Sequence, residues 1–271
     1  MVDVDQEDAD IREGMNNPVR SRSNDGEPLL EHLERFRVVI IESVAAVVIA
    51  GIICFVFAAR IVDLLMIPLH NASATSGFTD SEGLILRSVW PAEAFLASLK
   101  VALIAGTILA SPVIFHLLWR FVRVRLEARG KRLALAVVTT AVTFFFMGIA
   151  FCYFLVLPLC LLFFWQYNAR MGIAPEWTVG SYMSFSAMLL LSFGLVFEMP
   201  VAAAVLAKLG VLSSKVLVKN FWYAAFIIFI VAAILTPPDI MSQILLGVPM
   251  MGLYGLSILA AKVFARRAHD R

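Results

Sequence analysis

The fold class is decided by residues 193–201, which read FGLVFEMPV. They lie within an apolar run, Ser181 to Ala207, in which Glu198 is the only charged residue. A run of this length can cross the ~30 Å hydrocarbon core of a bilayer. Pro200 follows Glu198 by two residues and predicts a kink in the helix at that depth. The stretch therefore predicts a broken membrane-spanning helix that carries one carboxyl group.

Two interpretations of Glu198 follow from this placement. A neutral glutamic acid that is hydrogen-bonded to a neighbouring helix would be purely structural. An ionisable group at membrane depth costs several kcal/mol unless it faces protein or water, and such groups are rare and usually functional. We therefore favour a functional intramembrane carboxylate.

The composition agrees with a membrane protein. Hydrophobic residues make up 61% of the 271 residues and charged residues only 15%. These values exclude an ordinary soluble domain, and the length suits about half a dozen spanning helices with loops. Cys54, Cys152 and Cys160 lie in apolar runs without metal-ligand spacing. They are expected to be packing residues, and neither a metal site nor a cofactor is predicted.

Apolar runs predict an all-α polytopic membrane protein with six transmembrane helices. Residues 1–27 are predicted to be a disordered acidic tail, residues 28–265 the transmembrane domain, and residues 266–271 a basic C-terminus. Residues 28–37 should form a short interfacial helix, and residues 60–91 small surface helices around a polar loop at 71–83. The predicted spans are Val38–Ala59, Phe95–Trp119, Leu133–Tyr167, Ser181–Gly210, Phe221–Leu235 and Ile240–Phe264.

Two of these runs have unusual lengths. The third exceeds one crossing, and Gly148 and Pro158 are its expected bend points. The fifth reaches only about 22 Å at 1.5 Å per residue, which is short of the hydrocarbon core.

Lysine and arginine residues predict the orientation. With six spans, one side of the membrane collects nearly all of them, and the other holds only Arg60, Arg87 and Arg170. The basic side is the cytoplasmic one, so both termini are predicted to be cytoplasmic. This rule also explains the basic loop 120–132, so no nucleic acid is expected as a partner.

The chain contains no enzyme motif. There is no Walker lysine, no HExxH, no GxSxG and no nucleotide-binding glycine-rich turn. The remaining candidates for function are polar groups at defined depths in the membrane. Besides Glu198, they include Asp239 and Gln243, which are four residues apart and share one helical face. Such groups can receive polar elements of partner helices.

Several motifs together resemble TatC, the multispanning core of the twin-arginine protein translocase, from Leu29 to about Phe264. The motifs are EHLERFR at 31–37, SPVI with WRF at 111–121, residues 193–201, LTPPDIMSQ with PM at 235–250, and Ile67-Pro68-Leu69.

The resemblance implies a concave, glove-like six-helix bundle in the prokaryotic cytoplasmic (inner) membrane. It implies a receptor, not an enzyme, that binds twin-arginine signal peptides of folded cargo and recruits TatA- and TatB-type single-span proteins. Transport would be driven by the proton-motive force, without a cofactor. The lipid bilayer and other copies of the chain, within a larger complex, are the remaining expected partners.

Residue roles are carried over with the resemblance. Pro68 would shape the first outer loop. Partner helices would bind at Glu198, Asp239, Met241 and Gln243. Signal peptides would bind at Glu31, Glu34, Arg37, Phe121, Glu127, Lys131 and Arg132.

The chain departs from the family pattern at two positions. Arg35 and Gly130 stand where the family carries the acids associated with the signal's arginines. Glu31 and Glu127 lie four and three residues away, on the same helical faces, and are expected to substitute for them. Two alternatives stay open. One is a divergent paralogue that no longer binds twin-arginine signals. The other is a proton- or ion-coupled small-molecule transporter that uses Glu198 and Lys100.

Overall fold

The structure, a computed structural model, describes residues 27–75, 86–123, 131–172, 177–208, 210–235 and 240–269. It divides into two compact units, Met1–Glu42 and Ser43–Arg271, and each is considered by itself. Residues 1–26 lie outside the described residues, so the disordered tail stays a prediction. Described residues outside the helices form turns, bends and one β-bridge, between Arg87 and Thr178.

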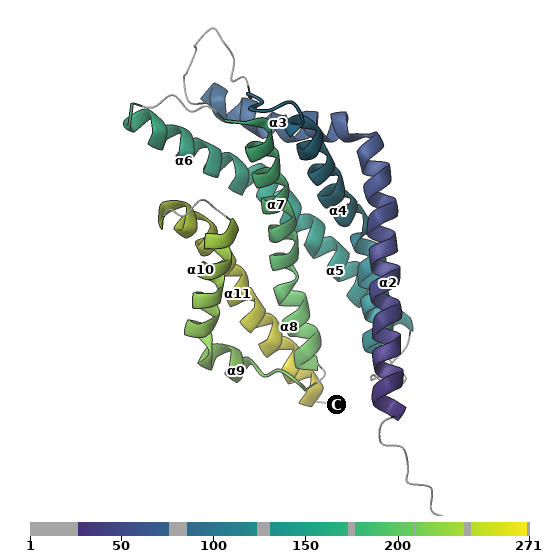
Figure 1. Cartoon of the computed structure of the whole chain (residues 1–271). Helices are drawn as coiled ribbons and strands as arrows, with labels where there is room; N and C mark the ends of the chain where they lie inside the picture. The colour runs from purple at the N-terminus through teal and green to yellow at the C-terminus, as the bar shows by residue number, and fades with distance from the viewer. Residues whose placement is uncertain are drawn as a thin grey trace, which may run out of the picture. The chain divides into compact units, whose positions relative to one another are not determined.

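Helices account for nearly all of the described chain (Figure 1). In order they are α2 (Glu27–Val56), α3 (Ala58–Thr75), α4 (Glu93–Arg123), α5 (Lys131–Phe151), the π-helix η1 (Cys152–Val156), α6 (Leu157–Arg170), α7 (Val179–Phe197), α8 (Met199–Lys208), α9 (Ser214–Lys219), α10 (Phe221–Leu235) and α11 (Ile240–His269).

Five segments in the described part of the chain are long and apolar enough to cross a membrane. They are Phe36–Val56, Glu93–Arg120, Leu135–Arg170, Val179–Lys208 and Gln243–Val263. The predicted fifth run forms a shorter apolar helix, Phe221–Ile234. The all-α membrane fold is thus confirmed, and the predicted fifth run is short, as expected; among the described residues five helices, not six, are long enough to span the membrane.

Three local expectations were wrong. Residues 28–37 form no separate helix, because α2 runs without a break from Glu27 to Val56. Helix α3 continues to Thr75, into the expected loop 71–83. Residues 86–90 are not helical, because their backbone pairs with the segment before α7. Arg87 N donates to Trp177 O, and Val179 N donates to Arg87 O, both at 3.1 Å. The short helix α9 was not predicted, although Ser213 caps its first turn.

A π-helical turn interrupts the third span directly before Pro158, the position at which the sequence predicts an irregularity. Leu157 N–H donates to Cys152 O, five residues back, so one π-helical turn precedes the proline. Such turns are a known cause of helix kinks. Gly148, the other expected bend point, lies inside α5 and serves packing instead.

Helices α5 and α7 cross closely through two glycines. A Cβ on Gly148 would lie 2.7 Å from Phe193 O, and one on Gly194 would lie 2.8 Å from the Phe145 ring. Small residues let helices approach within a bilayer, where no hydrophobic effect drives them together.

Around this crossing lies the largest buried cluster, which includes Cys152 and Cys160. The expectation that the cysteines are packing residues is confirmed, since all three are buried and none forms a disulfide within the described chain.

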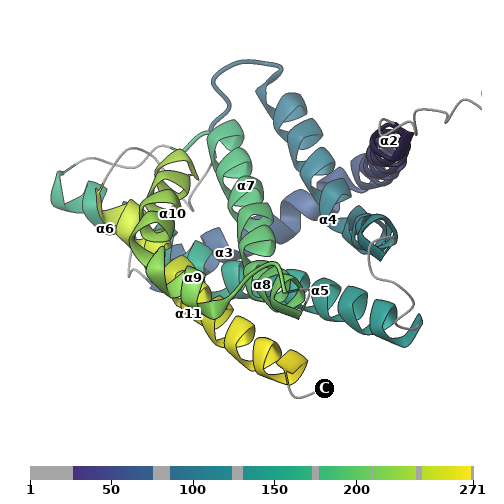
Figure 2. The ribbon, with the colours of Figure 1, turned by 90° about the horizontal axis from the view of Figure 1, so that it is seen from below.

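Helices α8, α10 and α11 form a second region of contact. Helix α8 packs along α11, and α10 packs on α11 as well. Figure 2 shows α7 and α8 following one another, with α11 beside α8. The junction of α7 and α8 falls at Glu198.

Candidate functional site

Glu198 lies where one long span breaks into two helices. Helix α7 ends at Phe197, Glu198 forms a turn, and α8 begins at Met199. Glu198 N donates to Leu195 O at 3.1 Å, and Ala202 N donates to Glu198 O at 2.8 Å. Pro200 fits the second position of α8, where its missing N–H would be unpaired in any case. The predicted break is confirmed.

The carboxyl group of Glu198 is deep and incompletely satisfied. Glu198 lies ten positions before Lys208 at the end of the span, which is about 15 Å of helix and half the hydrocarbon core. Its Oε1 atom is buried and has no hydrogen-bond partner among the described residues. The structural interpretation, a carboxyl group bonded through this oxygen to a neighbouring helix, is therefore not observed.

Gln243 ties α11 to α10. Its Nε2 donates to Phe229 O at 2.8 Å. One turn later, a Cβ on Gly247 would lie 2.7 Å from the Phe229 ring, so the glycine leaves room for that ring. Gln243 is thus already engaged within the chain. Asp239 lies outside the described residues, and so does the side chain of Met241, whose backbone belongs to α11.

Two of the predicted signal-binding residues have described side chains. Glu34 and Arg37 lie on α2, and Arg37 Nη1 is 3.4 Å from Glu34 Oε1. Both side chains are about two-thirds exposed. Glu127 lies outside the described residues. The side chains of Glu31, Phe121, Lys131 and Arg132 also lie outside them, although their backbones belong to α2, α4 and α5.

Pro68 lies inside α3, where it is buried. A proline removes the N–H that would bond to the carbonyl four residues earlier, here that of Leu64. The Tyr153 hydroxyl donates to this oxygen at 2.7 Å. The Tyr182 hydroxyl donates to the next carbonyl, that of Leu65. The third span and α7 thus hold the proline-containing helix through main-chain acceptors.

Glu93 is a buried acid whose structural role the sequence analysis missed. Its side chain is buried at the start of α4. Oε2 accepts from Val89 N at 2.6 Å, and Oε1 accepts from Gly180 N at 2.9 Å. A carboxylate is favoured at a helix N-terminus. Glu93 opens α4, and its carboxylate accepts from Val89, four residues before α4, and from Gly180 in the first turn of α7. The sequence signal was an acid directly after Trp90-Pro91-Ala92, but its partner is 87 residues away.

Glu198 and Lys100, the two residues that the transporter alternative would use, do not pair with each other. Lys100 is exposed on α4, and Oε1 of Glu198 has no partner among the described residues. Within the described ranges there is also no group of three or more His, Cys, Asp or Glu that could hold a metal ion.

Comparison with known proteins identifies the family. The model of the family described as "Sec-independent protein translocase protein (TatC)" matches residues 31–249. A TatC protein of Desulforapulum autotrophicum is 37% identical over 247 residues, which cover 91% of this chain and 88% of the relative. The chain belongs to the TatC family. It is therefore a component of a protein translocase and not an enzyme, and the solute-transporter alternative is set aside.

Further relatives agree with this assignment. The TatC protein of Carboxydothermus hydrogenoformans is 39% identical over 235 residues, which cover 86% of this chain and 92% of the relative. A crystal structure of the twin-arginine translocase receptor TatC superposes with a TM-score of 0.78 at 32% identity, covering 87% of this chain and all of that chain. The TatC fold predicted from the sequence motifs is thus confirmed.

Proposed function

We propose that this chain is the core receptor of a twin-arginine protein translocase. In this role it binds twin-arginine signal peptides of folded proteins and recruits TatA- and TatB-type single-span proteins for export driven by the proton-motive force. Membership of the TatC family supports the proposal, as does the crystal structure of a relative described as a twin-arginine translocase receptor. One observation carries the partner-binding part of it: a buried carboxyl oxygen at Glu198, at mid-membrane depth, that no described residue bonds.

The proposed partner site consists of Glu198, Asp239, Met241 and Gln243. Glu198 as a whole is partly exposed, so a partner helix that brings a polar or charged group to it would satisfy the carboxyl group without water. An intramembrane carboxyl group without such a partner is costly, so the interaction would favour assembly of the complex. Gln243 would contribute by holding α10 against α11, because its amide nitrogen is bonded to Phe229 O.

The proposed signal site consists of Glu31, Glu34, Arg37, Phe121, Glu127, Lys131 and Arg132. Glu34 supports the proposal because it is exposed and pairs only loosely with Arg37, at 3.4 Å. Exposed ion pairs contribute at most about 1 kcal/mol, so a guanidinium of the signal can take the place of Arg37. Arginine also offers a planar, bidentate fork that lysine lacks, which would give the site its preference.

The proposed orientation follows from the positive charges. Both termini and the loop 120–132 lie on the cytoplasmic side of a prokaryotic inner membrane, where a signal peptide first meets the receptor. Multi-pass insertion agrees with the five spans. Homo-oligomers within a larger complex are part of the same proposal.

The experiment that tests recruitment is co-purification. The full chain, expressed with single-span TatA- and TatB-type proteins, should retain them in mild detergent, and Glu198→Ala should retain less. Met188→Ala is a matched control, since Met188 is an exposed residue on the same span. Equal retention by all three chains would reject Glu198 as part of the partner site.

A further inference from the structure

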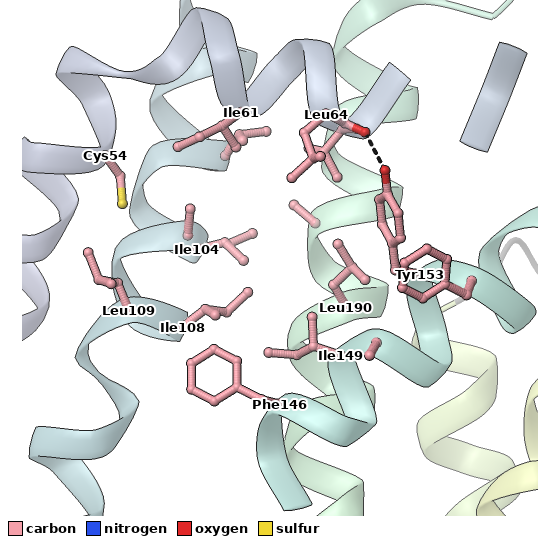
Figure 3. Close-up of a pocket in the computed structure, with 16 residues that line it drawn as sticks. Cys54, Ile61, Leu64, Ile104, Ile108, Leu109, Phe146, Ile149, Tyr153 and Leu190 are labelled. Carbon is pink, nitrogen blue, oxygen red and sulfur yellow. Dashed lines mark hydrogen bonds between the residues drawn. The ribbon is translucent and has the colours of Figure 1, made fainter. Parts of the chain in front are cut away.

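A cavity of about 560 Å³ lies between α4 on one side and α5, η1 and α7 on the other. Figure 3 shows Ile61 and Leu64 of α3 above it and Phe146 of α5 below it. Cys54 of α2 contributes to the lining on the side of α4. Every lining residue belongs to the unit Ser43–Arg271, and most belong to the spans Glu93–Arg120, Leu135–Arg170 and Val179–Lys208. The cavity is therefore at membrane depth.

The lining is hydrocarbon almost throughout. Only Cys54 and Tyr153 bring a side-chain heteroatom to it. The Tyr153 hydroxyl is engaged with Leu64 O at 2.7 Å, as the dashed line in Figure 3 shows. A buried water needs two to four polar partners. The cavity therefore suits neither water nor a polar solute.

The size of the cavity distinguishes between two apolar occupants. A 15-residue apolar helix about 10–12 Å wide and 22 Å long fills roughly 2,000 Å³, several times the available volume. A methylene group needs about as much space as a water molecule, roughly 30 Å³, so 560 Å³ holds a chain of nearly twenty carbons. The space fits one acyl chain and is too small for the hydrophobic helix of a signal peptide.

The mouth of the cavity opens toward the surroundings of the protein. Among its lining residues, Phe154, Leu109 and Phe146 are 76%, 53% and 41% exposed. Ala187 and Leu190, which line its inner wall on α7, are only 4% and 7% exposed. Lipid surrounds the exposed apolar side chains of spanning helices. Acyl chains are therefore the apolar species with direct access to the mouth of the cavity.

From depth, lining, volume and access together, we propose that this cavity binds one acyl chain of a membrane phospholipid. The chain enters past Phe154 and Leu109 and ends against Ala187 and Leu190. It fills the space that would otherwise separate α4 from the third span beneath α3. Packing contacts, not the hydrophobic effect, hold it there, because the bilayer is as apolar as the cavity.

The test uses a phospholipid that carries a photoreactive diazirine near the end of one acyl chain. The full chain is reconstituted into vesicles of this lipid, illuminated, and mapped by mass spectrometry. Lipids around the protein label exposed residues everywhere, such as Phe226 on α10, which is 68% exposed. Only a chain inside the cavity labels Ala187 and Leu190. Labelling of these two residues is the expected result, and its absence would overturn the proposal.

Two variants narrow the cavity from different helices, so one of them still provides the test if the other fails to fold. Ala105→Phe on α4 and Ala150→Phe on α5 each place a ring in the lining. Each should lower labelling of Ala187 by about an order of magnitude, since the ring occupies the space of the chain. Ala136→Phe, at an exposed position of α5, should leave it unchanged. Undiminished labelling in both cavity-narrowing variants contradicts the proposal, as does labelling of Ala187 by a diazirine-bearing signal peptide in place of lipid.

Discussion

The hydroxyl of Tyr153 donates a hydrogen bond, at 2.7 Å, to the main-chain oxygen of Leu64, an acceptor that Pro68 leaves without its helical donor. The tyrosine thus compensates for the proline, although Tyr153 and Leu64 are 89 residues apart in the sequence. This pairing explains how a proline is accommodated inside α3. It also joins α3 to the π-helical turn of the third span, because Tyr153 belongs to η1.

The compensation predicts a coupling between Tyr153 and Pro68. Tyr153→Phe should lower the free energy of unfolding by about 1 kcal/mol, the usual net value of such a bond. In a Pro68→Ala background the cost should largely vanish, because residue 68 then supplies the N–H for Leu64 O. Reversible unfolding in mixed micelles measures all four chains of the cycle.

Tyr182→Phe is the control for this cycle. Its hydroxyl bonds to Leu65 O, whose helical donor at Leu69 is not a proline. Its cost should therefore be the same in the wild-type and the Pro68→Ala backgrounds. Equal costs for Tyr153→Phe in the two backgrounds would show that Pro68 is not the reason for the bond.

Much of the fold could be predicted because it depends on local signals. Apolar runs predicted the spans, and Glu198 with Pro200 predicted the break between α7 and α8. Pro158 marked the place at which the third span is irregular, although not the π-helical turn, Cys152–Val156, that forms there. In each case the physical cause lies within a few residues of the feature.

The contacts that organise the site could not be predicted in this way. Glu93 bonds to Gly180 N, Tyr153 to Leu64 O, and Gln243 to Phe229 O. Each partner is a main-chain group, which every residue type carries, so no residue pattern marks it. The surface helix expected after the loop 71–83 is absent from residues 86–90 for the same reason, because the backbone of Arg87 pairs with that of Trp177 and Val179, far along the chain.

Glu198 should matter for export more than for folding. Glu198→Ala should impair export of a twin-arginine cargo, and Glu198→Gln should be milder because it keeps hydrogen-bonding capacity. A buried polar atom without a partner costs roughly 1–3 kcal/mol, so Glu198→Ala should unfold no more easily than wild type. Cargo export in cells and unfolding in micelles are the two measurements. If the Glu198→Ala variant exports cargo as well as the wild-type chain does, the carboxyl group has no function in export.

Gln243 should act through the position of α10. Gln243→Leu removes the bond to Phe229 O and should weaken association with the partner proteins without abolishing expression. An interhelical hydrogen bond in lipid contributes about 1 kcal/mol, so retention should fall severalfold. Gly247→Ala disturbs the same contact from the other side, because its Cβ would lie 2.7 Å from the Phe229 ring. Retention by Gln243→Leu equal to that of wild type would count against this role.

The short length of α10 should be part of the mechanism. Its 15 residues reach about 22 Å, so the bilayer beside it is expected to thin at a cost of a fraction of a kcal/mol per Å. Thinning lowers the barrier that a folded cargo must cross. An insertion of one apolar turn should therefore reduce export more than stability. The same insertion in the long segment Leu135–Arg170 is the control. If export tolerates both insertions equally, thinning beside α10 plays no part.

Recognition of the signal is the central claim, and crosslinking a twin-arginine signal peptide to the chain in membranes tests it most directly. The wild-type chain should crosslink this peptide and should crosslink a twin-lysine peptide far less. Glu127→Lys should lower affinity by about an order of magnitude or more, since breaking a buried charge pair costs about 2–5 kcal/mol. Restoring the family's acids, as Arg35→Glu with Gly130→Glu, should strengthen binding. If the wild-type chain binds no twin-arginine peptide and the double variant does, Glu31 and Glu127 do not substitute for the family's acids, and the chain is a TatC paralogue with a different ligand.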